Sequence, residues 1–314
     1  MMANRPIFVT EAEVARAVTP DEMLSVIGEA FSDQIAAGTR AVAELAIGTE
    51  TLTTLAMPAL DRDGVAVVKI VSVSRGDRNR LNSQLAVIDA FGQPIAILEA
   101  HALTALRTAA ASVHAAQALG VSGGHLLVLG SGRQAEAQAR AYISAMPIER
   151  LTIWARREEA AADMAKRLRD LNCAVDTAQS RKLAIGDADI MSSATASREP
   201  IVSGMHVKAG AHVDLVGSFR PDMREGDDAL MQRAQVFADT SDALNETGDL
   251  IDPIASGTLE RSQVRLISEM VLGGFERGEE TVTVFKSVGH AALDSVAARL
   301  ACRKLGIELE GIAP

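Results

Sequence analysis

Aromatic residues are scarce in this 314-residue sequence, which has one Trp, one Tyr and seven Phe. Apolar residues still make up 48% of it, so aliphatic side chains must form most of the core. A chain of this length can fold as one large domain or as two. Aliphatic cores are typical of helices packed on a parallel sheet, so we expect a globular protein of that kind.

Cysteines, basic clusters and long apolar runs are also rare or missing. The two cysteines, Cys173 and Cys302, lack the spacing of metal or redox motifs, so neither a metal site nor a disulfide framework is expected. The net charge is −10 and no basic patch is visible, so nucleic-acid binding is not expected. The N-terminus has no signal-peptide core, and no apolar run reaches about 18 residues, so membrane insertion is not expected. We therefore predict a soluble cytoplasmic protein.

The first third of the sequence mixes helical and β-rich segments. Capping boxes at Thr10 with Glu13 and at Thr19 with Glu22 predict two helix starts. Residues 40–98 are strand-like, with the most β-rich runs at 65–73 and 85–89. Helical periodicity follows over residues 103–119. This part of the chain therefore predicts a mixed α and β unit.

A different pattern begins at His125, where buried strands alternate with helices. Such alternation predicts βαβ units and a parallel sheet. The predicted strands cover residues 125–130, 151–155, 188–193, 212–217, 235–238 and 281–285. The predicted helices cover residues 134–145, 158–171 and 291–305.

A glycine-rich loop joins the first of these strands to its helix. It reads Gly130-Ser131-Gly132-Arg133-Gln134-Ala135, the G-x-G-x-x-A form of the dinucleotide-binding fingerprint. Gly130 permits the tight turn, Gly132 lets the backbone approach a pyrophosphate, and Ala135 allows close helix packing. The helix N-terminus offers N–H groups and a partial positive charge to phosphates. The motif alone is weak, but its place between a strand and a helix predicts a nicotinamide dinucleotide.

The end of the second strand indicates which dinucleotide binds. An acidic residue about 20 residues after the fingerprint usually holds the ribose 2′-hydroxyl of NAD. Here the strand ends in Trp154-Ala155-Arg156-Arg157, without that acid. Two guanidinium groups can pair with a 2′-phosphate, so NADPH is the predicted cofactor and NADH the alternative. The other interpretation is that Arg156 and Arg157 only begin a solvated helix.

Several strings, in the same order along the chain, resemble the ornithine cyclodeaminase/mu-crystallin family. The two most specific are Leu106-Arg107-Thr108-Ala109-Ala110 and Phe285-Lys286-Ser287-Val288-Gly289. The others are Met57-Pro58-Ala59, Lys69 on its strand, the loop at Gly130, Ala194-Thr195, Gly210-Ala211-His212-Val213 and Val216-Gly217-Ser218. Together they span about residues 40–298.

The resemblance implies an α/β fold with a Rossmann nucleotide-binding domain and a second α+β domain built from both chain ends. We place the Rossmann domain at residues 119–289, and the substrate-binding and dimerisation domain at residues 1–118 and 290–314. Family members use a nicotinamide to move hydride at a carbon that carries nitrogen and a carboxylate. They are similar in forming dimers, so a homodimer is expected.

The resemblance also assigns residues. Lys69, Arg107 and Arg40 would hold the substrate carboxylate, and arginine can grip such a group through two hydrogen bonds. Lys69 could instead be an edge-strand gatekeeper, and Arg107 could lie on an exposed helix face. His290 and His212 are candidates for acid–base catalysis or for structural hydrogen bonding. The substrate pocket would include Met57, Phe219 and His290. The cofactor would meet Thr108, Gly130, Ser131, Gly132, Arg133, Gln134, Arg156, Arg157, Thr195, Ser287, Val288 and Gly289.

Two acidic positions of the cyclodeaminases are changed in this sequence. Phe219 stands where those enzymes carry an aspartate base, and Leu55 replaces a glutamate ahead of Met57. Without these acids, deprotonation of an amino substrate is not expected. The run at residues 218–228 resembles the imine reductases of the family, which receive a ready-made C=N bond. We expect Phe219 to point inward as an apolar wall and the acids of this run to point outward.

These features predict NADPH-dependent reduction of Δ1-pyrroline-2-carboxylate or Δ1-piperideine-2-carboxylate to L-proline or L-pipecolate. The expected partners are this small imino or amino acid and a second copy of the chain. One alternative is an alanine dehydrogenase-like or open-chain ketimine reductase. Ornithine cyclodeaminase activity and a non-catalytic NADPH- or small-ligand-binding protein are further alternatives, the latter disfavoured because both Lys69 and Arg107 are present.

Overall fold

A computed structural model describes residues 5–32, 35–75 and 80–311. The chain forms two compact units, each built around its own sheet. The first unit contains the residues up to Arg107 and those from His290 onward, and the second contains Thr108–Gly289. The division between them falls inside helix α3 (His101–Ala118).

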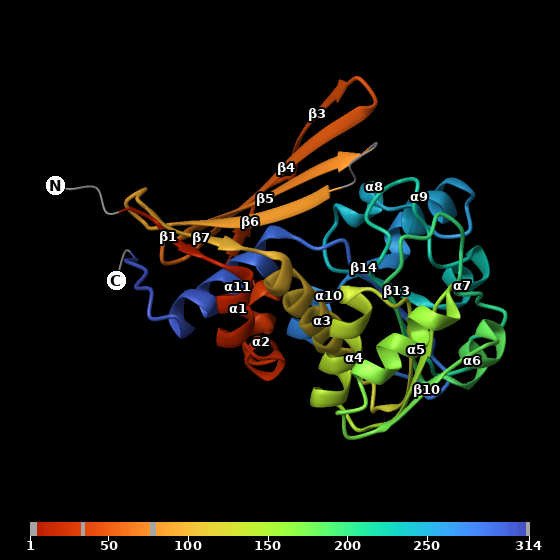
Figure 1. Ribbon diagram of the computed structural model, residues 1–314. Helices are drawn as coiled ribbons and strands as arrows, with labels where there is room; N and C mark the ends of the chain where they lie inside the picture. The colour runs from red at the N-terminus through yellow and green to blue at the C-terminus, as the bar shows by residue number, and fades with distance from the viewer. Residues whose placement is uncertain (1–4, 33–34, 76–79, 312–314) are drawn as a thin grey trace. The chain divides into compact units, whose positions relative to one another are not determined.

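The first unit has a seven-stranded sheet in the order β1-β7-β6-β5-β4-β2, with β3 also pairing with β4. All strand pairs are antiparallel except β1 with β7. A long hairpin of β3 and β4 extends the sheet (Figure 1). The strands are β1 (Ile7–Val9), β2 (Ile35–Ala37), β3 (Ala41–Ile47), β4 (Glu50–Asp61), β5 (Ala66–Arg75), β6 (Arg80–Ile88) and β7 (Pro94–Glu99).

The first two helices of this unit begin where the sequence predicts. Thr10 and Thr19 form the expected capping boxes at α1 (Glu11–Ala17) and α2 (Pro20–Ile27), and a short 3₁₀ helix follows at Gly28–Phe31. The C-terminal helix α11 (Ala291–Lys304) packs on β4 and β5. Its many buried alanines let its backbone approach the sheet closely, so this helix covers the face on which the candidate site is built.

The second unit has an eight-stranded sheet in which every pair is parallel, as the sequence predicts. The strand order is β10-β9-β8-β11-β12-β15-β13-β14, so the order reverses between β8 and β11. Ligands of such sheets bind at the carboxyl ends of the strands beside that point. The strands are β8 (Gly124–Leu129), β9 (Ile148–Trp154), β10 (Ala174–Thr177), β11 (Ile190–Ser193), β12 (His212–Leu215), β13 (Gln235–Ala238), β14 (Val264–Leu266) and β15 (Thr283–Lys286).

Helices connect these strands, and aliphatic side chains such as Leu127, Val213 and Val284 fill the core between them. The sequence did not predict the short elements β10, α6, α9 and β14, because three to eight residues carry little periodicity. The helices are α4 (Arg133–Ala145), α5 (Glu158–Arg167), α6 (Arg181–Asp187), α7 (Asp228–Arg233), α8 (Ala243–Glu246), α9 (Gly248–Ala255), a 3₁₀ turn (Arg261–Gln263) and α10 (Ile267–Gly273).

Within the core, His212 is a structural residue. It is fully buried, its Nδ1 lies 2.8 Å from Thr283 Oγ1, and its Nε2 lies 3.1 Å from Asp214 Oδ1. Tyr142 donates a hydrogen bond to the other oxygen of Asp214. Both ring nitrogens of His212 are therefore engaged inside the sheet, which favours structural hydrogen bonding over acid–base catalysis.

Two negative findings apply to residues 5–32, 35–75 and 80–311. No helix there is both long and apolar enough to cross a bilayer. The same residues contain no group of three or more histidine, cysteine, aspartate or glutamate side chains placed to hold a metal ion.

Candidate active site

Lys69 lies on the central strand β5 of the first unit. Its neighbours in register are Met57 on β4 and Leu85 on β6, so the edge-strand interpretation of Lys69 is wrong. Directly opposite residues share one face of a sheet. That face is covered by α11, because Met57 packs against Ala291 at the start of that helix. Lys69 is only 4% exposed, so its charge needs a partner.

The partner is Asp294 of α11, which the sequence analysis missed. Asp294 Oδ1 accepts hydrogen bonds from Lys69 Nζ (3.2 Å) and from Arg107 Nε (3.0 Å). Arg107 is 4% exposed, so it does not lie on an exposed helix face. The signal for Asp294 was present in the sequence as the single acid of a helix otherwise made mostly of small and apolar residues.

The electrostatics of this cluster favour a bound anion. Burial lowers the pKa of Lys69 to about 8, Asp294 opposes that shift, and the charges of Arg107 and Arg40 add to it. Burial raises the pKa of Asp294, but Arg107 and Lys69 outweigh it and hold that pKa below its usual value. Three cations thus influence a cluster with one buried carboxylate. Positive charge remains in excess, which suits an anionic substrate.

Two buried atoms of the cluster have unused hydrogen-bonding capacity. Among the described residues, neither Arg107 Nη1 nor Asp294 Oδ2 has a hydrogen-bond partner. Leaving a buried polar atom unpaired costs about 1–3 kcal/mol, so such atoms mark places where a ligand can bind. One donor and one acceptor are therefore available beside the salt bridges.

The remaining predicted substrate residues of this unit lie nearby. Met57 is buried beside Lys69, as the strand register shows. His290 precedes α11, its ring meets Phe31 edge to face with 5.9 Å between centroids, and its charge helps to lower the pKa of Asp294. The structure therefore brings Lys69, Arg107, Arg40, Met57 and His290 together, and their catalytic roles stay a prediction.

In the second unit, the glycine-rich loop follows β8 at the point where the strand order reverses. Gly130 has φ +121°, and a Cβ there would lie 2.7 Å from the carbonyl oxygen of Ala194. Gly132 is the N-cap of the 13-residue helix α4, and a Cβ on Gly132 would meet no atom within 4 Å. Among the described residues, no side chain caps this helix. The loop therefore leaves open space against its backbone and fits a pyrophosphate.

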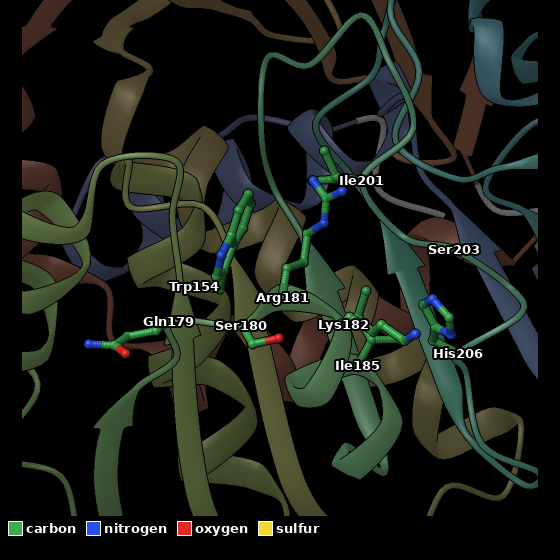
Figure 2. Close-up of a pocket in the computed structure, with 9 residues that line it drawn as sticks. All are labelled: Trp154, Gln179, Ser180, Arg181, Lys182, Ile185, Ile201, Ser203 and His206. Carbon is green, nitrogen blue, oxygen red and sulfur yellow. The ribbon is translucent and has the colours of Figure 1, made fainter.

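Beside this loop, the ends of β9 and β10 border a pocket of about 400 Å³ (Figure 2). Arg156 and Arg157 follow β9 and are both exposed. The guanidinium of Arg181 lies over the Trp154 ring, 5.1 Å from its centroid. Lys182 and His206 also line the pocket. Arg181 and Lys182 were missed because they begin a short helix that the sequence did not predict.

The predicted residues after β15 share one acceptor. Asp239, at the end of β13, accepts hydrogen bonds from Ser287 Oγ (2.8 Å) and from the backbone N–H groups of Val288 (3.0 Å) and Gly289 (2.7 Å). Asp239 was not predicted, although an acid directly after a buried strand was a usable signal. It fixes the backbone of Ser287, Val288 and Gly289 in one conformation.

The run at residues 218–228 differs from the expectation at Glu225 and at Phe219. Asp222 is exposed as expected, but Glu225 is fully buried. Its carboxylate points inward because it accepts hydrogen bonds from Thr195 and from the backbone near Gly217. Phe219, which was expected to point inward, is 47% exposed, so its ring lies outside the core of this unit, and its place in a substrate pocket stays a prediction. Thr108 is buried in α3, and its contact with the cofactor also stays a prediction.

Comparison with known proteins gives a consistent set of relatives. A model of the ornithine cyclodeaminase/mu-crystallin family matches residues 5–305. A Δ1-pyrroline-2-carboxylate reductase of Paracoccus denitrificans is 40% identical over 218 residues, 68% of this chain and 69% of the relative. The ketimine reductase mu-crystallin of Rattus norvegicus is 33% identical over 252 residues, 78% of each chain. The structure of Thermococcus litoralis Δ1-pyrroline-2-carboxylate reductase in complex with NADH and L-proline is 26% identical with a TM-score of 0.88, covering 96% of this chain and 98% of that one.

Proposed function

Because this chain belongs to the ornithine cyclodeaminase/mu-crystallin family, we propose that it is an NAD(P)H-dependent reductase of a cyclic imino acid. The substrates are Δ1-pyrroline-2-carboxylate or Δ1-piperideine-2-carboxylate, and the products are L-proline or L-pipecolate. The observation that carries the proposal is the buried cluster of Lys69 and Arg107 on Asp294, with Arg40 close enough to affect it. Its excess positive charge matches the single carboxylate of these substrates.

The first unit binds the substrate in this proposal. The substrate carboxylate accepts a hydrogen bond from the unused Nη1 of Arg107. The positive charges of Lys69 and Arg40 attract it as well. Asp294 keeps both buried cations in place, and its free Oδ2 can accept the N–H of a protonated imine. Met57 supplies an apolar contact for the ring from the strand beside Lys69. An imine carboxylate, with one anion and one N–H donor, fits both unused atoms of the cluster.

Lys69 also holds a proton that the reaction needs. Reduction of C=N is easier after the ring nitrogen is protonated, and Lys69 Nζ carries its proton below a pKa of about 8. Burial keeps this pKa near neutrality, which suits a group that must give up a proton. The reduced nicotinamide, when bound, supplies the hydride for the imine carbon. The part of the protein is to fix the substrate and its charges.

The titration of Lys69 gives a pH prediction. We expect kcat/KM to fall as pH rises through about 8, because the deprotonated lysine neither attracts the carboxylate nor donates a proton. In Lys69→Arg the charge persists above this pH, so substrate KM should stay constant there while kcat is lowered throughout. Steady-state kinetics between pH 6 and pH 10 would check this. An alkaline limb in the same place for both proteins would show that Lys69 is not the titrating group.

The second unit binds the cofactor in this proposal. The pyrophosphate binds to the N-terminus of α4 and to the loop before it, Gly130-Ser131-Gly132-Arg133-Gln134. Trp154 and the pocket beside it lie on the adenosine side, because the second strand of such sheets holds the adenosine ribose. Thr195 and the Ser287-Val288-Gly289 turn lie on the other side of the reversal point, where the nicotinamide half is expected.

Preference for NADPH rests on the cations at the end of β9. Replacing Arg156 and Arg157 together with alanine should lower kcat/KM for NADPH about 10- to 100-fold, because charge-assisted hydrogen bonds to the 2′-phosphate are lost. The kcat/KM for NADH should change by less than about threefold, because NADH has no 2′-phosphate for these arginines to bind. The exposed Arg169, replaced with alanine, serves as the control. Equal losses with both cofactors would contradict a 2′-phosphate role for these arginines.

We also infer a homodimer formed through the first unit. Strand β3 is exposed along its whole length and carries Val42, Leu45 and Ile47, each at least 55% exposed. Leu45 pairs with Leu52 of β4, which is 41% exposed on the same face. Leu45, Ile47 and Leu52 therefore form an exposed apolar patch on one face of the hairpin, and such patches mark association surfaces. Sedimentation equilibrium of the wild type should give a mass twice the 33.0 kDa of one chain. The double variant Leu45→Lys, Ile47→Lys should give the mass of a single chain. The exposed Leu183, changed to Lys, is the control, and a monomeric wild-type protein would contradict the inference.

A further inference from the structure

The buried carboxylate of Glu225 joins the ends of two neighbouring strands in the second unit. Its Oε1 accepts hydrogen bonds from Ser193 Oγ (2.6 Å), at the end of β11, and from the N–H and Oγ1 of Thr195 (2.8 Å each). Its Oε2 accepts from the backbone N–H of Gly217 (2.7 Å) and Ser218 (3.3 Å), after β12. One side chain therefore fixes the loops after both strands.

These two loops are in very close contact. A Cβ on Gly217 would lie 2.0 Å from the carbonyl oxygen and 2.3 Å from the nitrogen of Thr195. Only glycine allows this approach, because any side chain at residue 217 would overlap the Thr195 backbone. The Glu225 carboxylate supplies acceptors for the N–H groups that this close packing buries. Without it, both loops would have to move to reach water.

A second buried acid holds Glu225 in position. Asp249 Oδ1 accepts hydrogen bonds from the backbone N–H of Glu225 (2.7 Å) and Gly226 (2.9 Å), and Asp249 Oδ2 accepts from Lys286 Nζ (2.9 Å). Glu225, Asp249 and Lys286 are all fully buried. Lys286 ends β15 and directly precedes Ser287. The network therefore connects the loops after β11, β12 and β15.

All three loops lie on one side of the reversal point between β8 and β11. The strands β9 and β10 lie on the other side and correspond to the adenosine half of a dinucleotide, and the pocket at Trp154 extends from there to Ile201, Ser203 and His206 in the connection after β11. We propose that Glu225 is a positioning residue that holds the Thr195 and Gly217-Ser218 loops in the conformation that receives the nicotinamide half of the cofactor. This inference rests on the proposed function, since it requires that the second unit binds a nicotinamide dinucleotide.

The ionisation of Glu225 offers a separate readout. Burial, with the nearby Asp249, raises its pKa to about 6, while Lys286 and the donors Ser193 and Thr195 oppose the rise. The adjacent Arg224 donates instead to the Gly226 carbonyl and to Asp228. Glu225 is therefore ionised at neutral pH and accepts all five hydrogen bonds. Below about pH 6 the carboxylate takes up a proton. The protonated oxygen then carries an O–H group that faces the N–H and O–H groups whose hydrogen bonds it accepted before.

The test compares a whole cofactor with a fragment that lacks the nicotinamide. Dissociation constants for NADPH and for 2′,5′-ADP would be measured by calorimetry for the wild type, Glu225→Gln and Ser193→Ala, with the exposed Glu199→Gln as the matched control. Glutamine keeps the size of the side chain but turns an NH₂ toward buried donors. We expect Glu225→Gln to weaken NADPH binding about tenfold, or about 1.4 kcal/mol, with unchanged 2′,5′-ADP binding. Ser193→Ala, which removes one donor and no charge, should show a smaller loss in the same direction.

The positioning role predicts that the two variants affect the two ligands differently. It would be overturned if Glu225→Gln and Ser193→Ala weakened the binding of NADPH and of 2′,5′-ADP equally, or weakened the binding of neither. In the wild type, the ratio of the NADPH constant to the 2′,5′-ADP constant should rise below about pH 6 by more than it does in Glu225→Gln, where only the ligand phosphates titrate. A ratio with the same pH dependence in Glu225→Gln would also overturn it. A wild-type chain that binds neither NADPH nor NADH would contradict the proposed function itself.

Discussion

Replacing Arg107 with methionine should lower kcat/KM for the cyclic imine about 100- to 1000-fold. Methionine keeps an unbranched side chain of similar reach but removes the Nη1 donor and the salt bridge to Asp294. Truncating one partner of a buried, hydrogen-bonded charge pair costs about 2–5 kcal/mol of binding free energy, because the other charge, here the substrate carboxylate, is left unpaired. Here that cost falls on the group that holds the substrate carboxylate, so binding and turnover should both suffer.

Steady-state kinetics with the imine as the varied substrate would measure this loss. The exposed Arg16, replaced with methionine, is the control for loss of an arginine from the same unit. A thermal melt separates loss of substrate binding from loss of folding stability. The variant should remain folded, because Lys69 still neutralises Asp294. Activity within threefold of the wild type, in a folded variant, would show that Arg107 does not bind the substrate.

Replacing Gly130 with alanine should weaken NADPH binding about 10- to 100-fold. Alanine is strained at φ +121°, and its Cβ would lie 2.7 Å from the Ala194 carbonyl, so the turn must open. Backbone strain of this kind costs about 1–3 kcal/mol, and the cost falls on the loop that receives the pyrophosphate.

Gly257 provides a matched control for Gly130. It also has positive φ, +74°, but a Cβ there would meet nothing within 4 Å. Gly257→Ala should therefore show backbone strain without the clash and leave NADPH affinity unchanged. Calorimetric titration of both variants would decide the matter. Similar affinities for Gly130→Ala and Gly257→Ala would mean that the Gly130 turn does not shape the cofactor site.

The sequence was most informative where the physical signal is local. The alternation of buried strands with helices predicted a parallel sheet, and the place of the Gly130 loop between a strand and a helix predicted its position in the fold. Capping boxes at Thr10 and Thr19 were correct because both partners lie within three residues. The short strands β10 and β14 were missed because a run of three or four residues has no distinctive pattern.

The partners of the site residues could not be predicted in the same way. Lys69 and Arg107 were recognised as cations, but the carboxylate between them is 225 residues from one and 187 from the other. Glu225 was expected to face solvent because an acid in a loop usually does. Its burial depends on donors from Ser193, Thr195 and Gly217, which only the folded sheet brings together. A sequence shows which residues can ionise, and the fold decides what they face.

The central claim is reduction of a cyclic imino acid, and it is tested most directly by following oxidation of NADPH and NADH. The substrates to compare are Δ1-pyrroline-2-carboxylate, Δ1-piperideine-2-carboxylate, and pyruvate with ammonia. We predict rapid turnover of a cyclic imine, faster with NADPH than with NADH, and formation of L-proline or L-pipecolate. Turnover with pyruvate and ammonia alone, or tight NADPH binding without turnover of any substrate, would contradict it.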